Sequence, residues 1–222
     1  MELINYLLTF VGKNKKSNII LSGGKSPLKL YKILSKKKVN FKNINFFLLD
    51  DRIVNTKSKY SNYNNIKKSF IKNKIIYKKI FPLNRKNCKR KVVEKKIYLL
   101  KKLKTLSILG MGADGHFASI FIESKNFHKQ VSLFKKPSYV FTEKLGNPRF
   151  KRISMNLSMI LLSNIILLIL NTKKKIKLFK KISKIKKNSP YPISFLLKYG
   201  KKKILIYDGK KMRNLKDYTL QC

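Results

Sequence analysis

The sequence holds only two histidines, and one of them, His116, follows an aspartate in a glycine-rich segment that reads GMGADGH over residues 110–116. An imidazole exchanges protons near neutral pH, and a neighbouring carboxylate can fix its tautomer. We therefore expect His116 to act as a general base, with Asp114 beside it. His128 lies in a stretch without such companions and is expected at the surface.

The same segment contains the pattern G-x-G-x-x-G, which binds dinucleotides when it joins a strand to a helix. Here Asp114 would set a carboxylate against the pyrophosphate. The acid that holds the ribose is also missing at its usual distance, because Glu123 comes too early and Glu143 too late. These features argue against NAD.

A second candidate segment, SGGKSP at residues 22–27, follows an apolar run. Its glycines allow close backbone approach, Ser26 is expected to cap the next helix, and Pro27 suits its first position. A helix N-terminus behind a glycine loop suits phosphate, although an ordinary strand-to-helix turn explains the segment as well. The phosphate-binding candidates here are Ser22, Gly23, Gly24 and Lys25.

The third candidate segment is Asp50-Asp51-Arg52, in a chain with only nine acidic residues. Arg52 is expected to hold a phosphate through paired N–H donors, while Asp50 or Asp51 orients the guanidinium or a neighbouring base. The alternative is a simple capping turn.

Apolar runs alternate with helical patterns along the whole chain, which predicts an α/β fold with a mostly parallel sheet covered by helices. Strands are expected at residues 18–21, 44–49, 106–109, 139–142, 152–156, 165–170 and 204–207. Helices are expected at residues 27–37, 60–71, 90–103, 173–185 and 193–197. Most of these strands are continuously apolar and so belong in a sheet buried on both faces. Ligands of such sheets bind beyond the carboxyl ends of the strands, where the three candidate segments lie.

The length of 222 residues favours one domain, 1–222. Two cysteines make neither a disulfide framework nor a zinc cluster, and the first residues lack the order of a secretory signal, so a cytoplasmic location is expected. The longest apolar stretch, residues 153–170, is interrupted by serines and asparagines. It is expected to form strand, short helix and strand instead of a membrane span.

The net charge of +45 arises from 54 basic and 9 acidic residues spread over nearly the whole chain. A diffuse lysine excess, together with abundant Asn and Ile, indicates a compositional bias rather than a nucleic-acid footprint. Its expected consequence is attraction of phosphorylated substrates that weakens with salt.

The segments SGGKSP, LLDDR, SNY at residues 61–63 and GMGADGHFASIF, in this order and spacing, resemble the 6-phosphogluconolactonase family. This family belongs to a superfamily shared with glucosamine-6-phosphate deaminase. The later segment NPRFKRIS at 147–154 is similar to the family's approach to an Arg-led strand, so the resemblance covers nearly the whole chain.

The resemblance implies a three-layer α/β/α Rossmann-like fold and hydrolysis of 6-phosphoglucono-δ-lactone in the oxidative pentose phosphate pathway. It assigns His116 as the base that deprotonates water, with Asp114 beside it, and Arg52 and Arg152 as phosphate ligands. It also implies that Ser22, Gly23 and Gly24 surround the substrate. No metal or organic cofactor is implied, and the partner is the sugar phosphate alone, with no specific nucleic acid and no membrane. A monomer or small homo-oligomer is expected.

Three alternatives remain open at this point. The family's deaminase branch usually carries Asn-Glu-Pro after its Asp-Gly-His, whereas this chain has Ala118-Ser119-Ile120, which favours the lactonase. A basic nucleic-acid-binding protein and a folded relative without activity are the others. The last is kept open by departures from the family pattern at Lys25, Asp51 and Phe117.

Overall fold

A six-stranded sheet forms the centre of the computed structural model, which describes residues 2–13, 16–37, 40–185 and 189–219. Its strands, in spatial order, are β2 (Ile44–Leu48), β1 (Ser17–Leu21), β4 (Lys104–Gly110), β7 (Ile165–Ile169), β8 (Ile204–Tyr207) and β9 (Met212–Asn214). The strands from β2 to β8 are parallel, and only β9 at the edge is antiparallel to its neighbour. The predicted mostly parallel sheet is confirmed.

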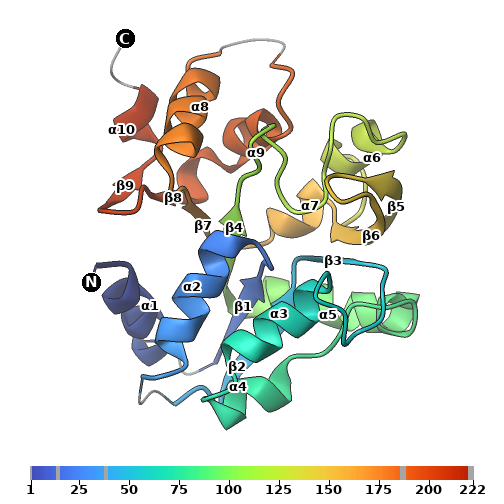
Figure 1. Cartoon of the computed structure of the whole chain (residues 1–222), viewed down its shortest axis with the longest axis vertical. Helices are drawn as coiled ribbons and strands as arrows, with labels where there is room; N and C mark the ends of the chain where they lie inside the picture. The colour runs from blue at the N-terminus through green and yellow to red at the C-terminus, as the bar shows by residue number, and fades with distance from the viewer. Residues whose placement is uncertain (1, 14–15, 38–39, 186–188, 220–222) are drawn as a thin grey trace.

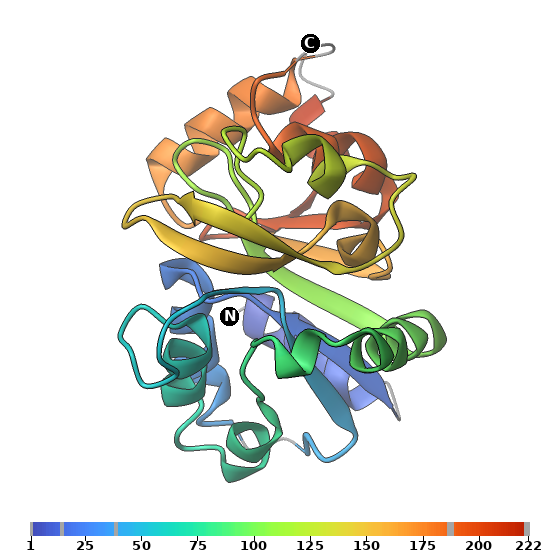
Figure 2. The same cartoon turned by 90° about the vertical axis from the view of Figure 1, so that its right-hand side faces the viewer.

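Helices cover both faces of this sheet, as the two views in Figures 1 and 2 show. On one side lie α2 (Lys25–Leu34), α3 (Asn62–Ser69) and α8 (Lys173–Ser183), and on the other lie α5 (Arg90–Lys102) and α9 (Ile193–Gly200). All five helices were predicted, with ends shifted by a few residues. The strands β1 and β7 are almost wholly buried between the layers, which explains their continuously apolar sequences.

One longer helix and several short elements were not predicted from the sequence. The longer one is α1 (Glu2–Lys13), which buries Leu3, Leu7, Phe10 and Val11 at the spacing of one helix face. The short ones are the strands β3 (Asp50–Arg52) and β9 and the helices α4 (Lys74–Lys79), α6 (Phe127–Val131), α10 (Lys216–Thr219), η1 (Lys86–Cys88) and η2 (Lys201–Lys203).

A second sheet of three antiparallel strands lies beside the first, in the order β3 (Asp50–Arg52), β6 (Phe150–Met155) and β5 (Tyr139–Leu145). Its long strands β5 and β6 are the yellow ribbons that cross the middle of Figure 2. Both were predicted as strands, but not as a separate antiparallel sheet. Leu49 connects the two sheets, because its N–H donates to Leu21 of β1 and its carbonyl accepts from Met155 of β6.

The apolar stretch at residues 153–170 forms the end of β6, the short helix α7 (Leu157–Ile160) and β7, in agreement with the predicted strand, short helix and strand. Among the residues that the structure describes, no helix is both long and apolar enough to cross a membrane.

Candidate active site

The loop that follows β4 holds His116 against Asp114, with 2.5 Å between Nδ1 of the imidazole and Oδ1 of the carboxylate. The glycines of the loop make this contact possible. A Cβ on Gly112 would overlap both side chains, and Gly115 adopts a φ of +77°, which glycine tolerates best. The predicted pairing of His116 with Asp114 is confirmed, and His128 is exposed as expected.

The electrostatics of this pair favour an ionised carboxylate. Burial raises the pKa of Asp114, but the hydrogen bond and the charge of His116 outweigh this effect, so the pKa lies below its ordinary value. Because Nδ1 faces the carboxylate, the second ring nitrogen, Nε2, is left to exchange a proton with another molecule.

Phe121 joins His116 to a second group of polar side chains. Its ring centroid lies 4.3 Å from that of His116 and 5.1 Å from Cζ of Arg152. Phe121 itself is buried, with 2% of its surface exposed. A Cβ on Gly146 would crowd both Phe121 and Nη2 of Arg152, so this turn also requires glycine. The imidazole and the guanidinium therefore share one aromatic surface.

Arg152 is paired directly with Arg52 across the antiparallel sheet, since the two residues are partners in the register of β3 and β6. Like charges at such a position are unfavourable unless something compensates them. Within the described residues, neither guanidinium makes an ion pair with a carboxylate. Burial, followed by the charge of Arg52, lowers the pKa of Arg152, and the charges of Asp50 and Asp51 only partly oppose this effect. An anion bound against the two guanidinium groups would therefore stabilise this cross-strand arginine pair.

Neutral oxygens hold both arginines in place. Nη1 of Arg52 donates to Oδ1 of Asn62 at 2.7 Å and to the carbonyl of Tyr60 at 3.2 Å, while its Nε is buried without a partner. Nε of Arg152 donates to the carbonyl of Leu145 at 3.0 Å. Neutral partners thus position both guanidinium groups without a direct ion pair.

Among the described residues, the guanidinium of Arg52 donates to Asn62 and Tyr60 and not to Asp50 or Asp51, so the alternative of a capping turn applies to Asp51. Asp51 accepts hydrogen bonds from the backbone N–H groups of Asn62 at 2.6 Å and Tyr63 at 3.0 Å, and so caps the start of α3. Burial raises the pKa of Asp51 to about 6, although these N–H groups oppose the shift. Asp50 instead accepts from the hydroxyl of Ser119 at 2.5 Å. The carboxylates therefore organise the backbone around the arginines.

The SGGKSP segment leads from β1 into α2, with Ser22 and Gly23 buried and Gly24 and Lys25 exposed. The expected cap by Ser26 is wrong, because α2 already begins at Lys25 and its N-cap residue is Gly24, which has no side chain to cap it. Gly23 is required for packing, since a Cβ there would overlap the side chain of Asn62. This contact joins the first candidate segment to the arginine pair.

Ser26 instead connects α2 to α8, donating to Oδ1 of Asn171 at 2.5 Å, in the loop after β7. The N-termini of both helices thus meet at the carboxyl edge of the sheet. Lys175, in the first turn of α8, is half-buried, and burial lowers its pKa. Lys175, Phe121 and Asn62 were not predicted as site residues from the sequence. Only the SNY segment, quoted for the family resemblance, could have drawn attention to Asn62.

The described parts of the chain contain no group of three or more His, Cys, Asp or Glu side chains that could hold a metal ion. The chemistry available at this site is that of an imidazole with its carboxylate, two guanidinium groups and backbone amides.

The chain is similar to known proteins in both sequence and fold. The sequence model of the family described as glucosamine-6-phosphate isomerases/6-phosphogluconolactonase matches residues 2–206. A 6-phosphogluconolactonase of Thermotoga maritima is 32% identical over 86% of this chain and 84% of its own length, and one of Neisseria meningitidis is 29% identical over 82% and 80%. The crystal structure of the Thermotoga maritima 6-phosphogluconolactonase superposes with a TM-score of 0.68 at 28% identity, covering 88% of this chain and 91% of that one.

Fold and site together define a three-layer α/β protein with a histidine–aspartate pair and an arginine pair beyond the carboxyl edge of a mostly parallel sheet. The chain belongs to the family of glucosamine-6-phosphate isomerases and 6-phosphogluconolactonase.

Proposed function

We propose that this protein hydrolyses 6-phosphoglucono-δ-lactone to 6-phosphogluconate. The observation that carries the proposal is the contact of Phe121 with both His116 and Arg152, which places a base and an arginine pair without a direct ion pair on one surface. A phosphorylated lactone needs both groups, because its phosphate must be held while its carbonyl is attacked. The relatives named 6-phosphogluconolactonase add support from sequence.

In the proposed reaction His116 takes a proton from water through Nε2 while the water oxygen bonds to the lactone carbonyl carbon. Asp114 stabilises the imidazolium that forms, since their contact at Nδ1 is already in place. The carbon–oxygen bond of the ring then breaks, and the leaving ring oxygen takes the proton from the imidazolium. The product is a carboxylic acid, which ionises in water. Backbone amides of the glycine loops can stabilise the developing oxyanion.

The phosphate of the substrate would lie against Arg52 and Arg152. A dianion placed there relieves the repulsion between the two cross-strand guanidinium groups. Lys25 and Lys175, near the N-termini of α2 and α8, would add positive charge on the same edge of the sheet. Ser22, Gly23 and Gly24 would border the substrate on the β1 side.

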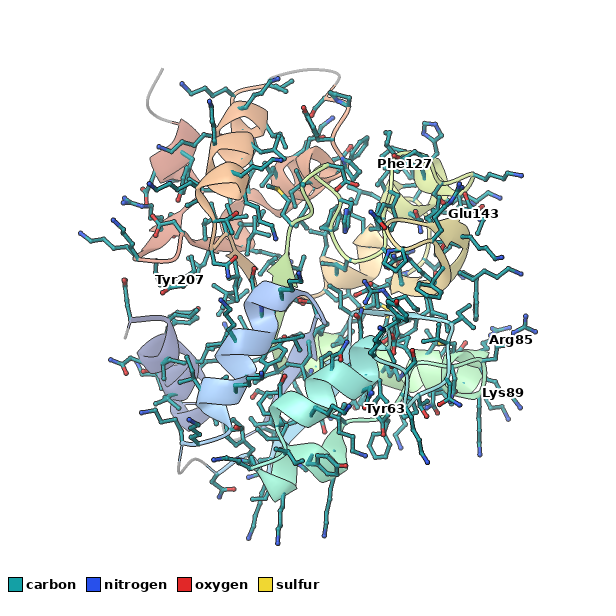
Figure 3. The ribbon with its side chains drawn as sticks, in the orientation of Figure 1. Tyr63, Arg85, Lys89, Phe127, Glu143 and Tyr207 are labelled. Atoms are coloured by element: carbon teal, nitrogen blue, oxygen red, sulfur yellow. The ribbon has the colours of Figure 1, made fainter. Side chains whose placement is uncertain are left out.

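We also propose that the chain acts as a single domain in the cytoplasm and that its charge has no specific nucleic-acid partner. One cluster of buried apolar residues runs from α1 to α10, which supports a single unit. Side chains with nitrogen at their tips, among them Arg85 and Lys89, project around most of the outline in Figure 3. Weak DNA binding that disappears at physiological salt would agree with this proposal.

The direct test is the loss of freshly made 6-phosphogluconolactone, corrected for spontaneous opening, with glucosamine 6-phosphate as the control substrate. The proposal expects accelerated opening of the lactone and no release of ammonia from the amino sugar. A folded protein that leaves the spontaneous rate unchanged would contradict it, and ammonia release would assign the chain to the other activity of its family.

A further inference from the structure

Asn62 occupies a buried position between the arginine pair and the first glycine loop. It is the first residue of α3 and has 4% of its surface exposed. A Cβ on Gly23 would overlap its side chain, so Asn62 is packed directly against the loop after β1. An amide side chain buried this completely must satisfy both its N–H donors and its carbonyl acceptor.

The side chain of Asn62 does so by connecting Asp50 to Arg52. Its Nδ2 donates to the backbone carbonyl of Asp50 at 3.0 Å and to the carboxylate Oδ1 of Asp50 at 3.2 Å. Its Oδ1 accepts from Nη1 of Arg52 at 2.7 Å. The opposite carboxylate oxygen of Asp50 accepts from Ser119, in the loop that carries His116. A continuous line of hydrogen bonds thus runs from the histidine loop to the guanidinium of Arg52.

An amide is the group that this position requires. The side chain must donate to a carboxylate on one side and accept from a guanidinium on the other, and asparagine does so with two separate atoms, Nδ2 and Oδ1. Aspartate could accept from Arg52, but it would face the carboxylate of Asp50 and would neutralise the arginine. Alanine would leave the Nη1 group of Arg52 with the carbonyl of Tyr60 alone.

We propose that Asn62 is a positioning residue for phosphate binding, which holds the guanidinium of Arg52 toward the anion while leaving its charge unpaired. The inference rests on the proposed function only in that Arg52 contacts the substrate phosphate. The free Nε of Arg52 agrees with it, because a buried N–H without a protein partner is available to a ligand oxygen.

The test measures the affinity for inorganic phosphate by calorimetric titration, together with KM for the lactone, in Asn62→Ala, Asn62→Asp, Arg52→Ala and the double variant Asn62→Ala/Arg52→Ala. Each variant is first shown to be folded, because a partly unfolded protein binds phosphate with a lower apparent affinity. Asn62→Ala is expected to weaken phosphate binding and raise KM roughly tenfold, as for coupled neighbours that share a hydrogen bond. Asn62→Asp is expected to weaken phosphate binding more than Asn62→Ala. In the Arg52→Ala background the Asn62→Ala change should have no further effect.

A matched control is Asn65→Ala, in the same helix, whose side chain donates to the carbonyl of Lys59 and not to a site residue. It should leave phosphate affinity and KM unchanged. Unchanged phosphate affinity in Asn62→Ala, or an equal loss with and without Arg52, would overturn the inference. If these Asn62 variants do not fold, Asn62→Ser, which keeps a short donor and acceptor, takes their place. Unchanged phosphate affinity in Asn62→Ser, or an equal loss with and without Arg52, would likewise overturn the inference. A wild-type protein that binds phosphate without opening the lactone would instead refute the proposed function alone.

Discussion

The imidazole of His116 packs on the phenyl ring of Phe121, with their centroids 4.3 Å apart and their planes tilted by 31°. The guanidinium of Arg152 lies over the same phenyl ring. Phe121 therefore contacts both the proposed base and a proposed phosphate ligand. The distance between the reacting group and the phosphate depends on this ring.

Phe121→Leu should lower kcat/KM for the lactone by roughly ten- to a hundredfold, because a small displacement of the base relative to the held phosphate is costly. Leucine keeps apolar contact but lacks the flat surface on which both groups rest. The control is Phe127→Leu, another buried phenyl ring, which contacts Phe195 and His128 instead. Equal effects of the two substitutions would show that only core packing was lost.

His116→Ala should lower kcat by roughly a hundred- to ten-thousand-fold with a modest change in KM, in line with the usual contribution of a general base. The residual activity would come from the held phosphate and from the amides near the carbonyl. Steady-state kinetics of the folded variant measures both constants. His128→Ala should behave like wild type because this side chain is exposed and lies outside the site. Near-normal kcat in His116→Ala would contradict the mechanism.

Asp114→Asn should lower kcat for the lactone with little change in KM, because a neutral amide no longer stabilises the imidazolium that forms when His116 takes a proton. The contact between Oδ1 of Asp114 and Nδ1 of His116 already places the carboxylate for this role, and His116 holds the pKa of Asp114 below its ordinary value against the effect of burial. Steady-state kinetics of the folded variant measures both constants. A kcat equal to that of wild type would exclude this role of the carboxylate.

Arg52→Ala and Arg152→Ala should each raise KM more than they lower kcat, because a phosphate contact is shared by the ground state and the transition state. The thermal stability of the two variants should differ. Arg152 is buried and donates to the carbonyl of Leu145, so its removal should also lower Tm, whereas Arg52 is only partly buried. Unchanged KM in both variants would remove the arginines from the site.

Asp51 should make the protein less stable as the pH rises from about 4 to about 6. Burial raises the pKa of this carboxyl to about 6 in the folded chain, above the ordinary value of 3.8. The folded state therefore binds its proton more tightly than the unfolded state, and stability falls by about 1.4 kcal/mol for each pH unit of that window. Denaturant unfolding across the window should give a flatter curve for Asp51→Asn than for wild type. Parallel curves would refute the shift.

Local sequence determined the histidine loop. The glycines around His116 and Asp114 fix a turn in which the two side chains, only two residues apart, must meet, so their pairing followed from spacing alone. The alternation of buried strands and helices followed from periodicity, because an apolar strand can be buried on both faces only in a sheet covered by helices.

Only the tertiary structure decided which distant residues complete the site. The family resemblance named both Arg52 and Arg152, but their pairing was not predicted. They lie a hundred positions apart and meet because the chain leaves the parallel sheet at Leu49 and continues in an antiparallel one, a change that no local pattern marks. The same is true of Phe121, which sequence could not distinguish from an ordinary core aromatic, and of Asn62, whose amide gains its role from Asp50 on one side and Arg52 on the other. Hydrogen bonds and ring contacts between separate segments depend on how the two sheets are placed against each other, and that placement is set by packing of the whole core.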